Sequence, residues 1–120
     1  MITLYHYWRS SSSFRVRWML NHKRIPHKLE HVHLLKNESH STTHLHRNPM
    51  GQVPVIKLDD GRHLAQSLAI AFYLDDAFSD EGPKIFRGST AYDRAREVHL
   101  AELINSGIQP LHNLGVLNTV

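Results

Sequence analysis

The pattern of apolar and polar residues changes period within the first third of the chain. Residues 2–7 alternate in the way that is typical of a strand, whereas residues 12–22 follow the longer repeat of an amphipathic helix. The apolar stripe of that predicted helix consists of Phe14, Val16, Trp18, Met19 and Leu20. Residues 27–33 alternate again after a break at Arg24 to Pro26. This part of the chain therefore predicts a strand, a helix and a second strand.

The middle of the chain predicts a pair of strands followed by a helix. Residues 36–48 are polar and indicate a loop that carries a short helix. Residues 53–58 are typical of a buried strand, Asp59-Asp60-Gly61 is a hairpin signal, and residues 62–65 form the returning strand. Residues 66–78 follow with the strongest helical pattern in the chain. A strand–strand–helix unit thus follows the strand–helix–strand unit.

The pattern divides the chain into two unequal parts. Residues 1–79 predict one α/β domain, and residues 80–88, which contain Pro83 and two glycines, predict a linker. Residues 89–120 predict helices with an interruption near Gly107. We expect this second part to be an incomplete helical domain.

Composition narrows the classes of function. The 120 residues are 41% hydrophobic and 21% charged, as in an ordinary globular protein. The sequence lacks an apolar run of about 18 residues and the features of a signal peptide, so we expect no membrane span and a cytoplasmic protein. The absence of cysteine excludes disulfides and a thiol nucleophile from the protein itself. The net charge of +3 is not gathered into a basic stripe, which argues against nucleic-acid binding.

Histidine is frequent, with 11 of 120 residues. His40 and His44 have the spacing of a metal pair on a helix, and His31 and His33 would share one face of a strand. Neither pair has a convincing third ligand nearby in the sequence. We therefore expect no metal site, and interpret these histidines as surface residues or neighbours of a substrate.

Four consecutive serines, residues 10–13, stand where the first predicted strand meets the first predicted helix. A helix N-terminus leaves about four backbone N–H groups without intrahelical partners and carries about half a positive charge. The serines can cap the helix, and they can also present hydroxyl and amide donors to an anion. Both interpretations are open from the residues alone.

Pro54 stands near the start of a predicted central strand, where a residue without an N–H donor is unexpected. A cis peptide bond between Val53 and Pro54 accounts for it, because it turns the preceding amide out of the sheet and toward a ligand. A trans proline at the edge of a sheet is the alternative.

Taken together, these residues resemble the zeta class of the glutathione transferases, the family of maleylacetoacetate isomerase. Residues 9–17 are similar to the class signature Ser-Ser-Cys-x-x-Arg-Val-Arg, and residues 48–54, 66–70 and 107–114 match three further motifs. The resemblance implies a thioredoxin-like N-terminal domain of the order βαβαββα that binds glutathione. It also implies that residues 89–120 are the first part of the all-α C-terminal domain.

The resemblance implies a catalytic set at the serine run. Ser10 is the first candidate for contact with the glutathione thiolate, together with Ser11 and Ser12, and Ser12 replaces the cysteine of the signature. Arg9 and Arg15 are candidate anchors for substrate carboxylates, since a guanidinium matches the geometry of a carboxylate. Arg15 is also a candidate catalytic residue, and its alternative is a place on the helix surface.

The resemblance also implies how glutathione binds. The backbone of Val53 would pair with the cysteinyl part of glutathione, while Gln66 and Ser67 would hold the γ-glutamyl carboxylate. Ser39 occupies the position of a glutamine that binds glutathione in the family, with His40 beside it as an alternative contact. The other candidate glutathione-binding residues are Ser10, Ser11, Ser12, Ser13, Phe14, Arg15, Gln109, Asn113, Leu114 and Gly115.

The activity that the resemblance implies is glutathione-dependent cis–trans isomerisation of maleylacetoacetate to fumarylacetoacetate. The thiolate adds to the cis double bond, the resulting single bond rotates, and elimination gives the trans isomer. The resemblance also implies a homodimer. Other glutathione chemistry, namely isomerisation of maleylpyruvate or conjugation of α-halo acids, is an alternative, and so is a binding module without turnover. We expect weak or no turnover from the 120 residues by themselves.

Overall fold

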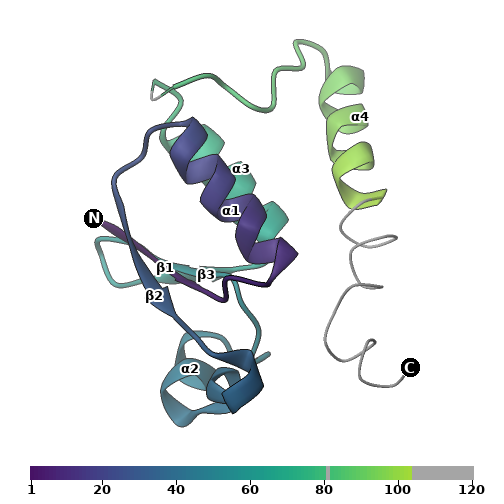
Figure 1. Ribbon diagram of the computed structural model, residues 1–120. Coiled ribbons are helices and arrows are strands. Elements are labelled where there is room, and N and C mark those ends of the chain that lie inside the picture. Colours follow the sequence, from purple (N-terminus) through teal and green to yellow (C-terminus); the bar gives the residue numbers. More distant parts are fainter. Residues whose placement is uncertain (81, 104–120) are drawn as a thin grey trace.

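The computed structural model describes residues 1–80 and 82–103, which form a sheet covered on one face by two helices, with a further helix beyond the linker (Figure 1). The elements are β1 (Ile2–His6), α1 (Ser11–His22), β2 (His27–His31), the 3-10 turns η1 (Leu34–Lys36) and η2 (Glu38–His40), α2 (Thr42–Arg47), β3 (Val55–Lys57), β4 (His63–Ala65), α3 (Ser67–Ala77) and α4 (Ala91–Glu102). The order βαβαββα predicted for the first domain is confirmed. Of the predicted helical part, residues 89–120, residues 104–120 lie outside the described residues.

The sheet has the strand order β2-β1-β3-β4. β1 is parallel to β2 and antiparallel to β3, and β3 and β4 form the predicted hairpin. Leu4 of β1 pairs with Leu29 on one side and with Ile56 on the other, so these three residues form one row across the sheet. Strand β1 is thus central, and its carboxyl end leads directly into the serine run.

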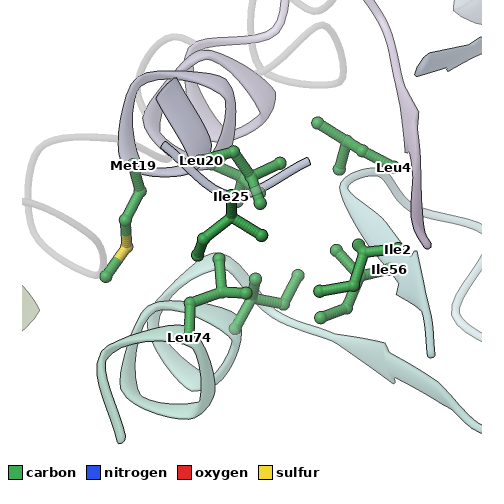
Figure 2. Packing of buried hydrophobic residues seen from close by; sticks show 9 residues of the cluster. Ile2, Leu4, Met19, Leu20, Ile25, Ile56 and Leu74 are labelled. Atoms are coloured by element: carbon green, nitrogen blue, oxygen red, sulfur yellow. The ribbon is translucent and has the colours of Figure 1, made fainter. Parts of the chain in front are cut away.

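The core lies between the sheet and the helices α1 and α3. Figure 2 shows side chains from the sheet, the α1 region and α3 that meet there, among them Ile2, Leu4, Leu20, Ile25, Ile56 and Leu74. Each of these six side chains is at most 5% exposed. Burial of one aliphatic side chain of this size stabilises a fold by about 1.5–3 kcal/mol. This packing fixes the position of the N-termini of α1 and α3.

Helix α1 divides its predicted apolar stripe between two faces. Val16 and Leu20 are buried in the core, whereas Phe14 and Trp18 remain 58% and 51% exposed. Neighbouring positions on a helix differ by about 100° in direction, so the face that packs against the sheet and α3 cannot also contain Phe14 and Trp18. The stripe is therefore correct as a helix signal but too wide as a list of core residues.

A buried ion pair joins the ends of α1 and α3. Lys23, which follows α1, is 0% exposed, and its Nζ donates to Oδ1 of Asp75 in α3 at 3.2 Å. Asp75 also accepts the backbone N–H groups of Ile85 (2.8 Å) and Phe86 (3.0 Å). The residues 82–88 that lead from α3 to α4 are therefore held against the α/β domain at this point.

Gly82 allows the chain to pass close to Lys23. Its φ is +62°, and a Cβ atom at this position would lie 2.7 Å from Cα of Lys23. Both the backbone conformation and the lack of space favour glycine here. None of the helices within residues 1–80 and 82–103 is long and apolar enough to span a bilayer.

Candidate functional site

The serine run divides its roles along the first turn of α1. Ser10 is the N-cap, and its Oγ accepts the backbone N–H of Ser13 at 3.1 Å. Ser13 is buried, and its Oγ accepts the backbone N–H of Tyr7 at 3.4 Å. Ser11 is exposed and Ser12 is half-buried at the open end of the helix. The capping interpretation is thus confirmed for Ser10, and the other interpretation, a site for an anion at the same helix end, is compatible with it.

Arg9 precedes this cap in the loop between β1 and α1. Its guanidinium lies 5.5 Å from the centre of the Trp8 ring, and both side chains are exposed. A cation over an aromatic face is attracted by the ring quadrupole. Arg9 is therefore near the helix end and open to a ligand.

A hydrogen bond links the N-terminal part of α1 to the start of α3. Nη1 of Arg15 in α1 donates to Oγ of Ser67, the first residue of α3, at 3.2 Å. Arg15 is half-buried, and this burial lowers the pKa of its guanidinium below the usual range. Ser67 is 6% exposed, whereas Gln66, with a φ of +72°, is exposed at the helix start. The structure therefore brings together Arg15, the serine run and Ser67, although Arg15 and Ser67 are 52 residues apart in the sequence.

The peptide bond between Val53 and Pro54 is cis, as the sequence predicts. The preceding loop is held by two donors to the carbonyl oxygen of Gln52, namely Nε2 of His44 at 2.8 Å and Nδ2 of Asn48 at 3.1 Å. Pro54 is buried and Val53 is half-buried next to β3. The loop therefore has a defined backbone at the point where Val53 is expected to meet glutathione.

His44 is a structural residue. It is 1% exposed, its Nε2 donates to Gln52, and its Nδ1 faces Nη1 of Arg47 at 3.4 Å. Both ring nitrogens of His44 thus have protein partners. This structural role explains why a histidine stands at the position that the spacing of a helical metal pair suggested. Within the ranges that the structure describes, no three His, Asp or Glu side chains are grouped so that they could hold a metal ion.

Ser39 is 5% exposed, and its Oγ lies 3.3 Å from Nδ1 of the exposed His40. A Cβ atom on Gly51 would lie 3.2 Å from the carbonyl oxygen of Ser39, so the turn at residues 48–51 packs directly on this backbone. Of Ser39 and His40, His40 is therefore the residue whose side chain can be reached from outside.

A cavity of about 380 Å³ lies beside the Arg15–Ser67 pair. Side chains from α1, α3, the segment 82–88 and α4 line it, and nearly all of them are apolar. The lining residues are Phe14, Arg15, Val16, Trp18, Met19, Ser67, Leu68, Ala71, Ile85, Phe86 and Ala101. Phe14 and Trp18, the exposed part of the α1 stripe, thus face a hollow that adjoins the candidate site.

The residues of this site fit a small anionic peptide such as glutathione. Two helix N-termini and one guanidinium offer donors and positive potential to carboxylate or thiolate groups. Four further candidate residues, Gln109, Asn113, Leu114 and Gly115, lie outside the described residues.

Two charged residues of structural importance were missed by the sequence analysis, namely Lys23 and Asp75. Asp75 lies on the buried face of α3 beside Leu74, and Lys23 directly follows α1, three residues after the buried Leu20. Opposite charges that follow the apolar positions of two helices are a signal for a buried pair, since such charges are rarely buried alone.

Comparison with known proteins agrees with this geometry. The family model for the glutathione S-transferase N-terminal domain matches residues 9–77. A maleylacetoacetate isomerase of Dictyostelium discoideum is 41% identical over 119 residues, which cover 98% of this chain and 52% of the relative. A maleylacetoacetate isomerase of Pseudomonas aeruginosa is 39% identical over 117 residues, which cover 96% of this chain and 54% of the relative.

Solved structures agree as well. A maleylacetoacetate isomerase from Methylobacterium extorquens, solved with bound malonate and GSH, superposes with a TM-score of 0.86 at 33% identity, covering 97% of this chain and 53% of that chain. A maleylpyruvate isomerase described as a bacterial zeta-class glutathione S-transferase gives a TM-score of 0.85 at 31% identity, again covering 97% and 53%. This chain thus spans about half the length of these relatives. The thioredoxin-like domain, the paired helix ends and the matching motifs together place this chain in the glutathione S-transferase family, in its zeta class.

Proposed function

We propose that this chain carries the glutathione site of an isomerase that converts maleylacetoacetate to fumarylacetoacetate. The observation that carries the proposal is the hydrogen bond between Arg15 and Ser67, which joins the starts of α1 and α3 into one anion-binding region. The names of the relatives from Dictyostelium discoideum and Pseudomonas aeruginosa support the choice of substrate. The proposal includes a cytoplasmic location and a homodimer. Sedimentation of the purified protein tests the oligomeric state.

In this proposal, Ser67 and the exposed Gln66 hold the γ-glutamyl carboxylate at the start of α3. The backbone of Val53 pairs with the cysteinyl part. Ser39 or its exposed neighbour His40, both in η2, contacts glutathione. Phe14 and Ser13 support this site from α1, with Ser13 acting through its bond to the loop.

Ser10 can both cap α1 and contact a thiolate. Its oxygen accepts the N–H of Ser13, while its own O–H remains a donor. A free thiol has a pKa of about 8.5, and a hydroxyl donor at a helix N-terminus lowers the pKa of a neighbouring thiol. Ser11 and Ser12, in the first turn, add backbone donors. Bound glutathione supplies the thiolate that adds to the cis double bond of the substrate and leaves again after rotation.

Arg9 and Arg15 hold carboxylates in this proposal. Arg9 stands in the exposed loop before Ser10 and is assigned to the substrate. Arg15 is already bonded to Ser67 and lines the apolar cavity, so its charge serves a carboxylate of glutathione or of the substrate chain.

Calorimetric titration with glutathione tests the binding site. We expect binding heat and a rise in melting temperature at millimolar glutathione. A folded chain that shows neither change would refute the glutathione assignment.

Substitution of Ser10 tests the thiolate contact. Ser10→Ala should lower turnover far more than glutathione affinity, and should also cost about 1 kcal/mol of stability through loss of the cap. Ser10→Asn is the second variant, because asparagine keeps a capping oxygen and replaces the hydroxyl donor with an amide donor. Thr90→Ala is the matched control, since Thr90 caps α4 through the same kind of bond, to the N–H of Asp93 at 3.0 Å. Equal losses of turnover and affinity in Ser10→Asn would reduce Ser10 to a binding residue.

Isomerisation of maleylpyruvate is the second candidate, because the zeta-class structure with a TM-score of 0.85 is named for that activity. Both substrates are cis-enoyl diacids, so the same residues serve either one. Comparison of turnover on the two substrates, with this chain and with a protein of the relatives' length, decides between them. We expect little turnover from this chain by itself.

A further inference from the structure

We propose that Arg17 is a positioning residue that holds the β1–α1 loop, residues 7–10, in the conformation that presents Arg9 and Ser10. The effect of Arg17 on turnover rests on the function proposed above, whereas its effect on the conformation of the loop does not.

Arg17 reaches back from α1 to the loop that precedes the helix. Its Nη2 donates to the carbonyl oxygen of Trp8 at 3.2 Å, and its Nη1 donates to the carbonyl oxygen of Tyr7 at 3.4 Å. One planar guanidinium therefore binds two successive carbonyl groups directly before Arg9. Because the five N–H donors of arginine have a fixed geometry, the two carbonyl groups are held in a defined relation.

His6 fixes the guanidinium from the other side. Nη1 of Arg17 lies 2.9 Å from Nδ1 of His6, the last residue of β1. Because a guanidinium can only donate, Nδ1 must accept and His6 must be neutral with its proton on Nε2. His6 is 9% exposed, and its ring centre is 5.9 Å from that of His31. Burial, followed by the charges of Arg17 and His31, lowers the pKa of His6, which keeps the acceptor available.

The partners of Arg17 distinguish its role from that of an ordinary surface arginine. Within the described part of the chain, no carboxylate forms an ion pair with it. Its contacts are the two carbonyl groups, the imidazole and the face of Phe14, whose ring centre is 5.8 Å away. Arg15, two residues earlier, instead binds Ser67. The two arginines of α1 therefore serve different parts of one site.

Hydrogen exchange of the purified chain, measured by mass spectrometry, tests the proposal with the variant Arg17→Gln. A glutamine is too short to bind both carbonyl groups and His6. We expect peptides that cover residues 7–12 to exchange about tenfold faster, since hydrogen bonds from a charged donor are lost, while peptides from α3 are unchanged. Arg24→Gln is the matched control, because Arg24 is exposed just beyond the same helix.

Exchange over residues 7–12 that matches the Arg24→Gln control would overturn the proposal, and so would an equal increase over the whole sheet. If Arg17→Gln does not fold, Arg17→Lys replaces it. A lysine has three N–H donors on one compact ammonium but lacks the planar fork of arginine, so it cannot bind the three acceptors in the same arrangement, and we expect an intermediate increase of about threefold. An unchanged loop in Arg17→Lys then counts against the proposal.

A second measurement connects the loop to function. Where glutathione binds and turnover is measurable, Arg17→Gln should lower kcat about tenfold while KM for glutathione changes less than about twofold, because Ser67 and Val53 are untouched. A faster-exchanging loop in a chain that binds no glutathione would leave the positioning role intact and refute the proposed function instead. A rise in KM with unchanged kcat would contradict the assigned role of Arg17.

Discussion

The two ends of helix α1 hold positive charge in opposite ways. At the N-terminal end, the side chain of Arg17 reaches back from the middle of the helix and binds neutral acceptors, namely a histidine nitrogen and two backbone carbonyl groups. Just beyond the C-terminal end, Lys23 is fully buried and binds the carboxylate of Asp75. One helix therefore carries a cation without a described counter-charge at one end and a neutralised ion pair at the other.

The difference follows from solvation. A fully buried ammonium loses its water, at a cost of several kcal/mol, and persists only with a counter-charge and further hydrogen bonds. A half-exposed guanidinium keeps part of its hydration and needs no carboxylate. The N-terminal end of α1 thus keeps a positive potential for an incoming anion, while the charge of Lys23 beyond the C-terminal end is neutralised by Asp75.

Removal of the buried carboxylate should have the largest effect. Asp75→Ala leaves Lys23 without its counter-charge and the N–H groups of Ile85 and Phe86 without an acceptor. We expect a loss of about 3–5 kcal/mol in the free energy of unfolding, measured by urea denaturation. Asp76→Ala is the control, because Asp76 is the next residue and is exposed. Similar losses in the two variants would show that the buried pair is not a special source of stability.

Removal of the hydroxyl of Ser67 should affect glutathione binding at the N-terminal end of α1. Ser67→Ala takes away the acceptor of Arg15 and a proposed donor to the γ-glutamyl carboxylate. We expect glutathione affinity to fall by about 1.5–3 kcal/mol, or roughly ten- to a hundredfold, because the lost bond involves a charge. Calorimetry gives the affinity, and Ser79→Ala, just after α3, is an exposed control. An unchanged affinity would remove Ser67 from the site.

The two ends should also lose stability in different ranges of pH. Burial raises the pKa of Asp75, but the N–H groups of Ile85 and Phe86 and the Lys23 ammonium outweigh it, so the net pKa is lowered. Asp75 therefore stabilises the fold above its unfolded pKa of about 3.9, and this contribution is lost as the pH falls through the lowered value. Urea denaturation of the unaltered chain and of Asp75→Asn should differ at pH 7 and converge in strong acid. A constant difference would contradict the linkage.

The contribution of His6 to stability should change at a pH nearer to neutrality. Its lowered pKa favours the neutral ring in the folded state, so its contribution is present above the unfolded pKa of about 6.5 and is lost as the pH falls from there toward the folded value. Arg17→Gln should raise the pKa of His6, because it removes a neighbouring positive charge. NMR titration of the His6 ring measures this smallest effect, and His27, whose Nδ1 lies 2.8 Å from the carbonyl oxygen of Ile25, is the control.

Local signals in the sequence were sufficient for most of the fold. The predicted helices 12–22 and 66–78 correspond to α1 (Ser11–His22) and α3 (Ser67–Ala77), and the cis bond at Pro54 was expected from proline chemistry. These features depend on residues close in the chain. The cap formed by Ser10 was predicted on the same grounds.

What the sequence could not give depends on contacts between distant segments. Periodicity placed Phe14 and Trp18 in the same stripe as Val16, but only the packing of α1 against the sheet and α3 determines which part of the stripe is buried. The bonds from Arg15 to Ser67 and from Lys23 to Asp75 each join residues 52 apart. No local rule selects such partners.

The attachment of the segment 82–88 has a consequence for limited proteolysis. A protease cleaves where a segment can leave the surface and extend into its active site. Residues 85 and 86 donate their backbone N–H groups to Asp75, and Pro83 accepts from Lys23, so this connection must first detach. Its composition resembles that of a cleavable linker, yet the intact protein should resist cutting there, and Asp75→Ala should make the segment the first site of digestion.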